Sequence, residues 1–402
     1  MNSALPHSYL TLIRHHSGVL AVAFLAVFTG NLGQSFFIGL FQQPISEHLH
    51  LTAGEFGKIY AVITITAGFL IMYFGPKIDW VNPRRYALFI LSALLLGLAF
   101  LSQSSWWFLG VIGLGLVRLC GQGLMTHLGS TLAAREFSLN RGRALGIIGL
   151  AMPTGEVILP PLTALLLIWL SWQQVWWSIW AFIVLLWLVL FLCVDWPEAP
   201  QEKKKKGEQQ YRDTQNPMFE SRFWLLMPML LVLPITLTGI FLYQAQLSAD
   251  LGASSTTYAL ALTAMGLFRF PVALFGGRLI DELGVSVLAR VYLLPYALAL
   301  LMASLMTGNS ALWILMLGAG MGMSISSSVG DSLLVKLWGK EHLGRVRSLK
   351  SAFLVFSTGI TPALLGVLLD RGVHFQSILM GMLVFLIMSC LLAQAPIKQA
   401  QA

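Results

Sequence analysis

Apolar residues occur along the chain in blocks of about 20 residues, separated by short polar breaks. A helix rises 1.5 Å per residue and needs about this length to cross ~30 Å of hydrocarbon. Helices are favoured because a segment in lipid must satisfy its backbone hydrogen bonds internally. The pattern predicts an all-α membrane protein with twelve transmembrane helices, spans 1 to 12, at 18–41, 54–75, 86–103, 107–132, 143–169, 174–194, 225–249, 256–277, 286–307, 311–335, 348–369 and 374–394.

The composition of the chain agrees with this pattern. Of its 402 residues, 57% are hydrophobic and 10% are charged, whereas a soluble domain carries roughly a quarter charged residues. The excess of apolar residues is concentrated in the blocks. It therefore indicates membrane-spanning segments rather than one large soluble core.

The net charge of +8 is explained by where the basic residues lie. All of the 25 Lys and Arg except Lys58, Arg118, Arg269 and Arg371 fall in the tails, or in or beside the loops that join an even-numbered span to the next odd-numbered one. This bias is the positive-inside rule, and it predicts that both termini face the cytoplasm. No nucleic-acid partner is implied, and we expect an integral protein of a bacterial inner (plasma) membrane.

One polar segment is much longer than the other loops and divides the chain in two. Residues 195–224 are charged and rich in Pro and Gln, a composition typical of a solvated linker. We predict an N-terminal six-helix bundle at 1–194, a cytoplasmic linker at 195–224 and a C-terminal six-helix bundle at 225–402. The lysine run at 203–206 is compatible with binding to anionic lipid, but a solvated role in the linker is the favoured interpretation.

The two predicted bundles repeat each other. Gly75 and Asp79 after span 2 match Gly277 and Asp281 after span 8, at an offset of 202 residues. The entries of spans 5 and 11 are also similar, at an offset of 204 residues. Parallel repeats of this kind are typical of transporters that rock one half against the other.

The loops that carry the first repeat are candidate gates. A glycine lets helix ends approach closely, and an aspartate can face the positive end of a neighbouring helix or the arginines of its own loop. Such contacts, formed in one orientation of the halves and broken in the other, would make a bistable gate. The alternative is ordinary helix capping. The candidate gating residues are Gly75, Asp79, Arg84, Arg85, Gly277 and Asp281.

These motifs resemble the signatures of the major facilitator superfamily, and the resemblance covers the whole chain. The segment GPKIDWVNPRR at 75–85 resembles the signature after span 2, although Trp80 follows the aspartate and Asn82-Pro83 precede the arginines. The run RLCGQG at 118–123 is similar to the intramembrane arginine element of span 4, with its order altered. The resemblance implies two pseudo-symmetric six-helix bundles and secondary active transport by alternating access.

A weaker resemblance concerns one branch of the superfamily. The entry NRGRALG to span 5 and an arginine close to a proline in span 8 are similar to the monocarboxylate and oxalate:formate branch. The aromatic Asp-Gly-Gly-type motif expected at span 1 of animal monocarboxylate carriers is absent. The branch would imply a small organic anion as the substrate.

Ionisable residues within spans are functional candidates, since a charge in lipid is costly. Arg118 in span 4 and Glu156 in span 5 lie at depths that differ by only ~3 Å on consecutive antiparallel helices, so we predict that they pair. In one interpretation the pair is a permanent salt bridge. In the other, Glu156 is the proton-coupling site, which takes a proton in one state and releases Arg118 to an anionic substrate.

Arg269 in span 8 and Asp331 in span 10 lie at comparable depths and form the second predicted pair. The alternative is that Arg269 binds the carboxylate of a substrate, for which the forked guanidinium is well suited. In the families that the chain resembles, an arginine in span 8 has this role, although Arg269 lies about one turn farther from the loop glycine. Asp331 is a second candidate for proton coupling.

The resemblance further implies that spans 1, 4, 7 and 10 line a central cavity. Amides and hydroxyls on these spans would orient a small polar solute. The alternative for each is an interhelical hydrogen bond, worth ~0.6 kcal/mol on average. With the two arginines Arg118 and Arg269, the candidate substrate-binding residues are Asn31, Gln34, Gln122, Tyr243, Gln244 and Ser327.

Motifs of other chemistry are missing from the sequence. There is no Walker-type glycine loop, no His-Glu-x-x-His helix and no serine elbow. The three cysteines, Cys120, Cys193 and Cys390, are too widely separated to suggest a metal spacing or a disulfide framework. We therefore expect no enzymatic activity, no cofactor and no bound metal.

Taken together, the sequence predicts a proton-coupled secondary active transporter that moves a small organic anion and functions as a monomer in the lipid bilayer. The case for an anion is that two intramembrane arginines face two carboxylates, which leaves the charge balance dependent on a proton or a ligand. One alternative is an exporter of larger amphipathic compounds, such as drugs, siderophores or metabolites. Another is a non-transporting membrane sensor on the same fold.

Overall fold

A computed structural model of the chain describes residues 9–103, 106–137, 141–197 and 217–400. The side chains at positions 10, 141, 272–281 and 340–344 lie outside this description. The described residues form helices joined by turns and contain no β-strand. The predicted all-α class is confirmed.

The spans of the first half are built from several helical pieces, most of them joined end to end. The pieces are α1 (Tyr9–His15), α2 (Ser17–Gly30), η1 (Asn31–Gly33), α3 (Ser35–Ile38), η2 (Gly39–Phe41), α4 (Gln42–His48), α5 (Ala53–Phe74), η3 (Gly75–Asp79), α6 (Pro83–Gln103), α7 (Trp107–Leu116), η4 (Val117–Met125), α8 (Thr126–Glu136), α9 (Arg141–Gly149), α10 (Ala151–Leu166) and α11 (Trp172–Cys193).

The second half contains fewer and longer helices. They are η5 (Pro217–Phe219), α12 (Ser221–Leu242), α13 (Gln244–Leu251), α14 (Ser255–Leu283), α15 (Val285–Val291), α16 (Leu294–Leu305), α17 (Asn309–Asp370), α18 (Phe375–Leu392) and α19 (Gln394–Gln399).

The number of spans agrees with the hydropathy pattern. Ten helical runs among the described residues are long and apolar enough to cross a membrane. A bent pair, Ser17–Gly33 followed by Ser35–His48 at 47°, forms one further span. The remaining predicted block, 256–277, is occupied by the 29-residue helix α14. The twelve-helix architecture is confirmed.

Span 1 bends where it crosses span 4. η1 ends at Gly33, and Gln34 is extended, with ψ 150°. A Cβ atom on Gly33 would lie 2.4 Å from the backbone nitrogen of Gln122, and one on Gly121 would lie 2.7 Å from the nitrogen of Gly33. The two backbones can approach this closely only because both positions are glycine.

Spans 10 and 11 form a single helical run, α17, which is interrupted at Gly339. The residue has φ 74° and ψ 170°, a conformation that glycine adopts without steric cost. Beside the interruption, Arg222 donates a hydrogen bond to the carbonyl of Leu337 at 2.8 Å, and Trp338 Nε1 donates to Glu220 at 3.1 Å. These contacts fasten the beginning of α12 to the end of span 10.

Contacts between residues divide the chain into two compact units. Unit 1 comprises Met1–Ile38, Thr66–Gly155 and Leu165–Lys204, and unit 2 comprises Gly39–Ile65, Glu156–Ala164 and Lys205–Ala402. Parts of spans 1, 2 and 5 thus group with the second half of the chain. The predicted domain boundaries at 194 and 225 stay a prediction, and each unit is described by itself.

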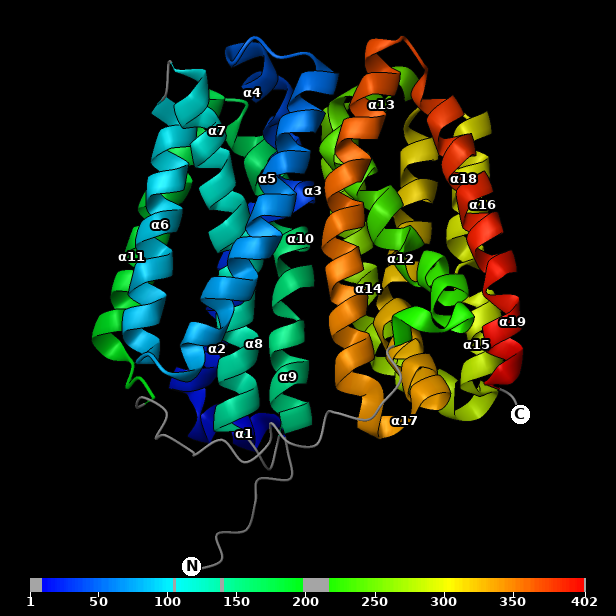
Figure 1. Cartoon of the computed structure of the whole chain (residues 1–402). Helices are drawn as coiled ribbons and strands as arrows, with labels where there is room; N and C mark the ends of the chain where they lie inside the picture. The colour runs from blue at the N-terminus through cyan, green and yellow to red at the C-terminus, as the bar shows by residue number, and fades with distance from the viewer. Residues whose placement is uncertain (1–8, 104–105, 138–140, 198–216, 401–402) are drawn as a thin grey trace, which may run out of the picture. The chain divides into compact units, whose positions relative to one another are not determined.

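Unit 1 is a bundle of long helices that run side by side (Figure 1). α2 packs against α8 and η4, while α6 packs against α7, η4 and α11. The indole of Trp187 on α11 is buried and donates a hydrogen bond to the hydroxyl of Thr29 at 3.1 Å. The indole therefore links span 6 to span 1.

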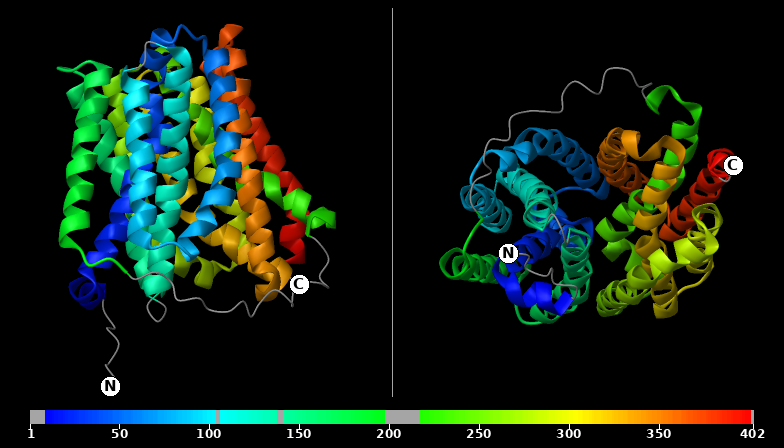
Figure 2. Two further views of the ribbon diagram at one scale, coloured as in Figure 1. Left: turned by 60° about the vertical axis from the view of Figure 1, so that its left-hand side comes forward. Right: turned by 90° about the horizontal axis from the view of Figure 1, so that it is seen from below.

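Unit 2 is organised around α17, which packs against α12, α14 and α16. The helices of the unit are seen nearly end-on in the second view of Figure 2. The first half of α5 also packs here: the hydroxyl of Tyr243 lies 2.9 Å from the carbonyl of Ala53 and 2.8 Å from that of Pro362. This hydroxyl links span 7 to spans 2 and 11.

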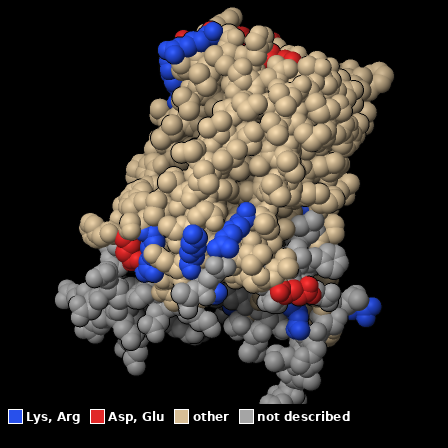
Figure 3. All heavy atoms as spheres, turned by 90° about the vertical axis from the view of Figure 1, so that its right-hand side faces the viewer, with Lys and Arg blue, Asp and Glu red and all other residues tan. Residues whose placement is uncertain are grey.

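The surface carries the charge pattern of a membrane protein. On the face shown in Figure 3, a broad band without Lys, Arg, Asp or Glu separates charged side chains at its two ends. Large apolar side chains are exposed along the helices, among them Val384, Ile387 and Leu391 of α18. Exposed apolar surface on this scale indicates lipid as the surrounding medium.

Candidate transport site

A buried ion pair connects span 5 to span 8. Nη1 of Arg269 on α14 lies 2.5 Å from each of the two carboxylate oxygens of Glu156 on α10. The side chain of Glu156 is 2% exposed and that of Arg269 is 16% exposed. A buried charge requires a partner of opposite sign, and here each residue is the partner of the other.

Prolines in both helices loosen the backbone around this pair. Proline has no N–H, so Pro161 leaves the carbonyl of Val157 without its usual helical donor. The hydroxyl of Thr263 on α14 donates to this carbonyl at 3.4 Å and to that of Ala259 at 2.9 Å. On α14, Pro271 lies two residues after Arg269. The charged pair therefore lies where prolines interrupt the backbone hydrogen bonding of both helices and where Thr263 of α14 is hydrogen-bonded to α10.

Much of the Arg269 guanidinium is unused by this pairing. Its hydrogen bonds to Glu156 involve only Nη1. Nε and Nη2 make no hydrogen bond with the residues whose side chains the structure describes. A guanidinium can bind a carboxylate through two parallel N–H bonds. Arg269 thus keeps donors of the kind that bind an organic anion.

The predicted partner of Arg269 was wrong. Asp331 on α17 accepts a hydrogen bond from Arg347 at 2.7 Å and lies 3.8 Å from Nζ of Lys350. Asp331 is 41% exposed, so it belongs to a solvated charge cluster rather than to a buried pair. The chain turns back at Gly339, and Arg347 and Lys350 at the start of span 11 thereby reach Asp331.

The predicted partner of Glu156 was Arg118, and the structure gives Arg269 instead. Arg118 lies in η4, a π-helical segment of the kind often found at functional sites. It is 2% exposed and donates a hydrogen bond to the carbonyl of Gly33 at 2.8 Å and to the hydroxyl of Ser35 at 3.4 Å. The bend of span 1 supplies these acceptors, because Gly33 is the last residue of η1.

The other candidates in unit 1 lie close to the same crossing. Asn31 is buried, and its Nδ2 donates to the carbonyls of Phe28 at 3.0 Å and Ala151 at 3.3 Å. Gln34 and Gln122 are partly exposed. Asn31 therefore joins span 1 to span 5.

The remaining candidates lie in unit 2. Tyr243 is buried between the carbonyls described above. The amide of the adjacent Gln244 is also buried, and neither its nitrogen nor its oxygen has a hydrogen-bond partner in the described structure. Ser327 on α17 is exposed.

The first predicted gating loop is a short 3₁₀ turn, η3, followed by the start of α6. Gly75 is buried, and Asp79 is exposed. Arg84 donates a hydrogen bond to the carbonyl of Phe191 at 2.8 Å, and Arg85 is exposed. Asn82 accepts from the backbone nitrogen of Arg84 at 2.9 Å and so caps α6. The capping role belongs to Asn82, rather than to the aspartate of the motif.

The second predicted gating loop is helical. α14 continues through Gly277 and Asp281 to Leu283, and the turn comes at Gly284, where φ is 77°. The side chains of Gly277 and Asp281 lie outside the described residues, as do the lysines at 203–206. The predicted end of span 8 at 277 was therefore about two turns early, since the polar residues of the motif occupy the last turns of the helix.

One polar contact of unit 2 was not predicted from the sequence. Asp370, the last residue of α17, accepts hydrogen bonds from the hydroxyl of Thr52 at 2.8 Å and from the backbone nitrogen of Gly54 at 3.0 Å. It thereby satisfies an N–H at the beginning of α5. The sequence around Asp370 gives no sign of this role, because an aspartate at the end of one helix does not show which distant helix it caps.

Twelve spans and a buried ion pair between two of them are the architecture of a membrane transporter. The sequence model described as Major Facilitator Superfamily matches residues 23–245 and again residues 224–399. The chain belongs to this superfamily, and it is a transporter rather than an enzyme. The resemblance drawn from the loop motifs is thus confirmed.

Solved structures of similar fold agree with this assignment. A bacterial homolog of the human lysosomal transporter Spinster, in an inward-facing and unoccupied conformation, has a TM-score of 0.70 at 14% identity, over 99% of this chain and 98% of that chain. The occupied form of that homolog has a TM-score of 0.67 at 14% identity, over 96% of each chain. A comparison with curated protein sequences gave no match.

Proposed function

We propose that this transporter couples the movement of a small organic anion, such as a monocarboxylate, to the movement of a proton. The observation that carries the proposal is the Arg269–Glu156 pair, in which a buried carboxylate occupies one nitrogen of a guanidinium. A substrate carboxylate would bind the same guanidinium through the donors that Glu156 leaves unused.

Coupling follows because the substrate carboxylate and Glu156 compete for the positive charge of Arg269. When the substrate carboxylate binds Arg269, one guanidinium faces two carboxylates in a low-dielectric interior, where the uncompensated negative charge is costly. Protonation of Glu156 removes this cost. Binding of the anion and uptake of a proton at Glu156 are therefore favourable together and unfavourable apart, as coupled transport requires.

We assign roles to the other polar residues according to how buried they are. Arg118 and Asn31 support the crossing of spans 1, 4 and 5 and would meet substrate only after a rearrangement. Gln244 offers an amide without a partner. Asp331, in its solvated cluster, is the weaker proton-coupling candidate. The distribution of Lys and Arg supports an orientation with both termini in the cytoplasm. We further propose that the protein resides in a bacterial inner membrane and functions as a monomer.

Transport by purified protein in liposomes tests this function. An imposed pH gradient should drive accumulation of an organic acid by the native protein. Glu156→Gln, which cannot take up a proton, should lose gradient-driven accumulation but retain exchange of substrate across the membrane. Glu47→Gln is the matched control, because the exposed side chain of Glu47 accepts a hydrogen bond from the neighbouring Gln43 on α4; it should transport normally.

A second variant tests the substrate side of the pair. Arg269→Lys keeps the charge but loses the fork, so the affinity for a carboxylate should fall by about ten-fold or more if bidentate binding is lost. Arg14→Lys, at an exposed position of α1, should have no effect. Unchanged affinity in Arg269→Lys, or accumulation only of bulky amphipathic cations, would contradict the proposal and favour an efflux function.

A further inference from the structure

Two side chains from distant spans fasten the beginning of span 2 within unit 2. The carboxylate of Asp370, at the end of α17, accepts hydrogen bonds from the hydroxyl of Thr52 at 2.8 Å and from the backbone nitrogen of Gly54 at 3.0 Å. The hydroxyl of Tyr243, at the end of α12, lies 2.9 Å from the carbonyl of Ala53. Because α18 and α19 run back from this point to the C-terminus, these contacts lie at the end of the unit that is remote from the C-terminus.

Span 2 also has a local cap, so it does not need Asp370 to begin as a helix. The backbone nitrogen of Thr52 donates to the carboxylate of Glu55 at 2.9 Å, and the nitrogen of Glu55 donates to the hydroxyl of Thr52 at 3.2 Å. This reciprocal arrangement is a capping box. The first turn of α5 can therefore persist without Asp370, and the bonds to Asp370 hold the helix in place rather than form it.

Glycines bring the backbones of α5 and α17 together at the same place. A Cβ atom on Gly57 would collide with the carbonyl of Pro362, and one on Gly366 would collide with the carbonyl of Ala53. Either atom would also collide with the hydroxyl of Tyr243. The first half of α5 and the second half of α17 are therefore in direct backbone contact, which only glycine permits.

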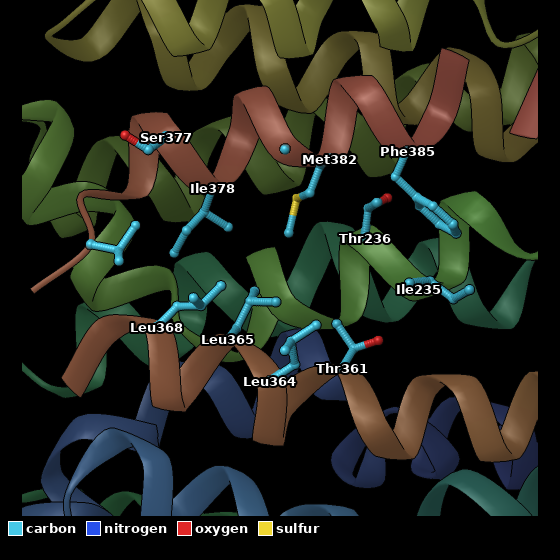
Figure 4. A pocket seen from close by; sticks show the side chains of 12 residues that line it. Ile235, Thr236, Thr361, Leu364, Leu365, Leu368, Ser377, Ile378, Met382 and Phe385 are labelled. Atoms are coloured by element: carbon cyan, nitrogen blue, oxygen red, sulfur yellow. The ribbon is translucent and has the colours of Figure 1, made fainter. Parts of the chain in front are cut away.

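The opposite face of α17 is packed less closely. Thr361, Leu364 and Leu365 point into an apolar crevice of about 420 Å³, which α17 forms with α12 and α18 (Figure 4). At 3.6 residues per turn, Gly366 and Asp370 lie on the other side of the helix. The tight contact with span 2 is thus a property of one face of α17 rather than of the whole helix.

The hydrogen bonds of Asp370 are of a kind that water can replace. Thr52 and Asp370 are both exposed, so if the two helices part, each group exchanges its partner for solvent with little loss of free energy. The positive end of α5 then keeps the carboxylate of Glu55 beside it. The contact therefore holds the helices together without making their separation costly.

We infer that Asp370 and Tyr243 form a latch, which holds the first half of span 2 against spans 7 and 11 and keeps this end of unit 2 closed. Transport by alternating access opens this end once in each cycle, so the latch is released and remade each time. The inference rests on the superfamily to which the chain belongs. It is independent of the identity of the substrate and of the coupling ion.

The accessibility of a residue buried below the latch reports its release. Thr64 on α5 is 4% exposed and packs beside Gly359 of α17. Thr64→Cys is introduced into a protein whose native cysteines, Cys120, Cys193 and Cys390, are replaced by alanine. The rate at which a hydrophilic maleimide labels this cysteine, in purified protein in lipid nanodiscs, should measure how often the two helices part.

Two variants remove the two parts of the latch. Asp370→Ala should raise the labelling rate by about five-fold, and Tyr243→Phe, which keeps the ring and loses only the hydroxyl, should raise it by a similar factor. Asp370→Asn keeps an acceptor oxygen without the charge and should fall between the native protein and Asp370→Ala. Asp250→Ala is the matched control, because Asp250 accepts from the backbone nitrogen of Phe375 and so links α13 to α18 without contacting span 2; it should leave the rate unchanged.

Two results would overturn the inference. One is an unchanged labelling rate in Asp370→Ala or in Tyr243→Phe, which would show that the glycine contact closes this end without the latch. The other is an equal increase in Asp250→Ala, which would show that any change at this end loosens it. The labelling requires neither a substrate nor a pH gradient, so these results are separate from any failure of the Arg269–Glu156 proposal.

Discussion

The two arginines within the spans, Arg118 and Arg269, satisfy the same physical requirement in different ways. Arg118 is almost fully buried, and the acceptors described above are a backbone carbonyl and a hydroxyl. Arg269 is partly accessible and pairs with the carboxylate of Glu156. A carboxylate carries a charge that a proton can neutralise, whereas a backbone carbonyl carries none. The difference supports our proposal that Arg269, rather than Arg118, belongs to the coupling site.

The largest effect is expected from removing the buried cation. Arg118→Ala leaves the carbonyl of Gly33 without its donor and opens a cavity, so it should destabilise the protein by about 2–4 kcal/mol. The midpoint of thermal unfolding in detergent measures this loss. Arg14→Ala, on an exposed surface, is the control. If Arg118→Ala keeps the stability of the native protein but loses transport, Arg118 belongs to the substrate site and its role is not structural.

The glycine crossing beside Arg118 supplies the next test. Gly33→Ala would put a Cβ atom 2.4 Å from the nitrogen of Gln122. Span 1 must then move, at a cost of about 1–3 kcal/mol. Gly149→Ala is the matched control, since a Cβ atom there meets nothing within 4 Å, and it should be neutral or stabilising. Equal unfolding midpoints for the two variants would show that the backbones of spans 1 and 4 do not approach closely at Gly33.

A double-mutant cycle examines the second arginine. Glu156→Gln leaves Arg269 without its counter-charge, and because Arg269 is partly accessible we expect a loss of only about 1–2 kcal/mol. Adding Arg269→Gln should recover part of this loss, because the unpaired charge is removed. Strict additivity of the two single effects would show that the residues are not coupled in the folded protein.

The smallest effect is expected at the charge cluster of α17. The Asp331–Arg347 pair is 41% and 47% exposed, and exposed pairs contribute about 0–1 kcal/mol. Asp331→Asn should therefore leave both the unfolding midpoint and proton-driven uptake nearly unchanged. Loss of proton coupling in this variant would move the coupling site away from Glu156 and restore Asp331 as its candidate.

The fold could be predicted from the sequence because lipid imposes a simple rule. A segment of sufficient length and hydropathy must be helical and must span, so the twelve blocks correspond closely to the helices observed. The segment at 75–85 and the RLCGQG run at 118–123 were sufficient to indicate the family. The end of span 8 was misplaced because a glycine-rich polar segment can continue a helix when packing supports it.

The partners within the site could not be predicted in the same way. Distance from a helix end gives depth, but it does not give the direction in which a side chain points around the helix axis. The π-helical winding at Arg118 and the paired prolines after Glu156 both change this direction. Arg118 is hydrogen-bonded to span 1 and Glu156 to span 8.

The most direct test of the coupling mechanism is the number of protons taken up when an organic anion binds. A carboxylate that transport assays identify as a substrate is added to detergent-solubilised protein in weak buffer, and a pH indicator reports the proton exchange. We expect binding to be accompanied by uptake of about one proton per anion at Glu156, and Glu156→Gln should bind the anion without this uptake. Equal proton uptake by both proteins, or none by the native protein, would contradict this mechanism.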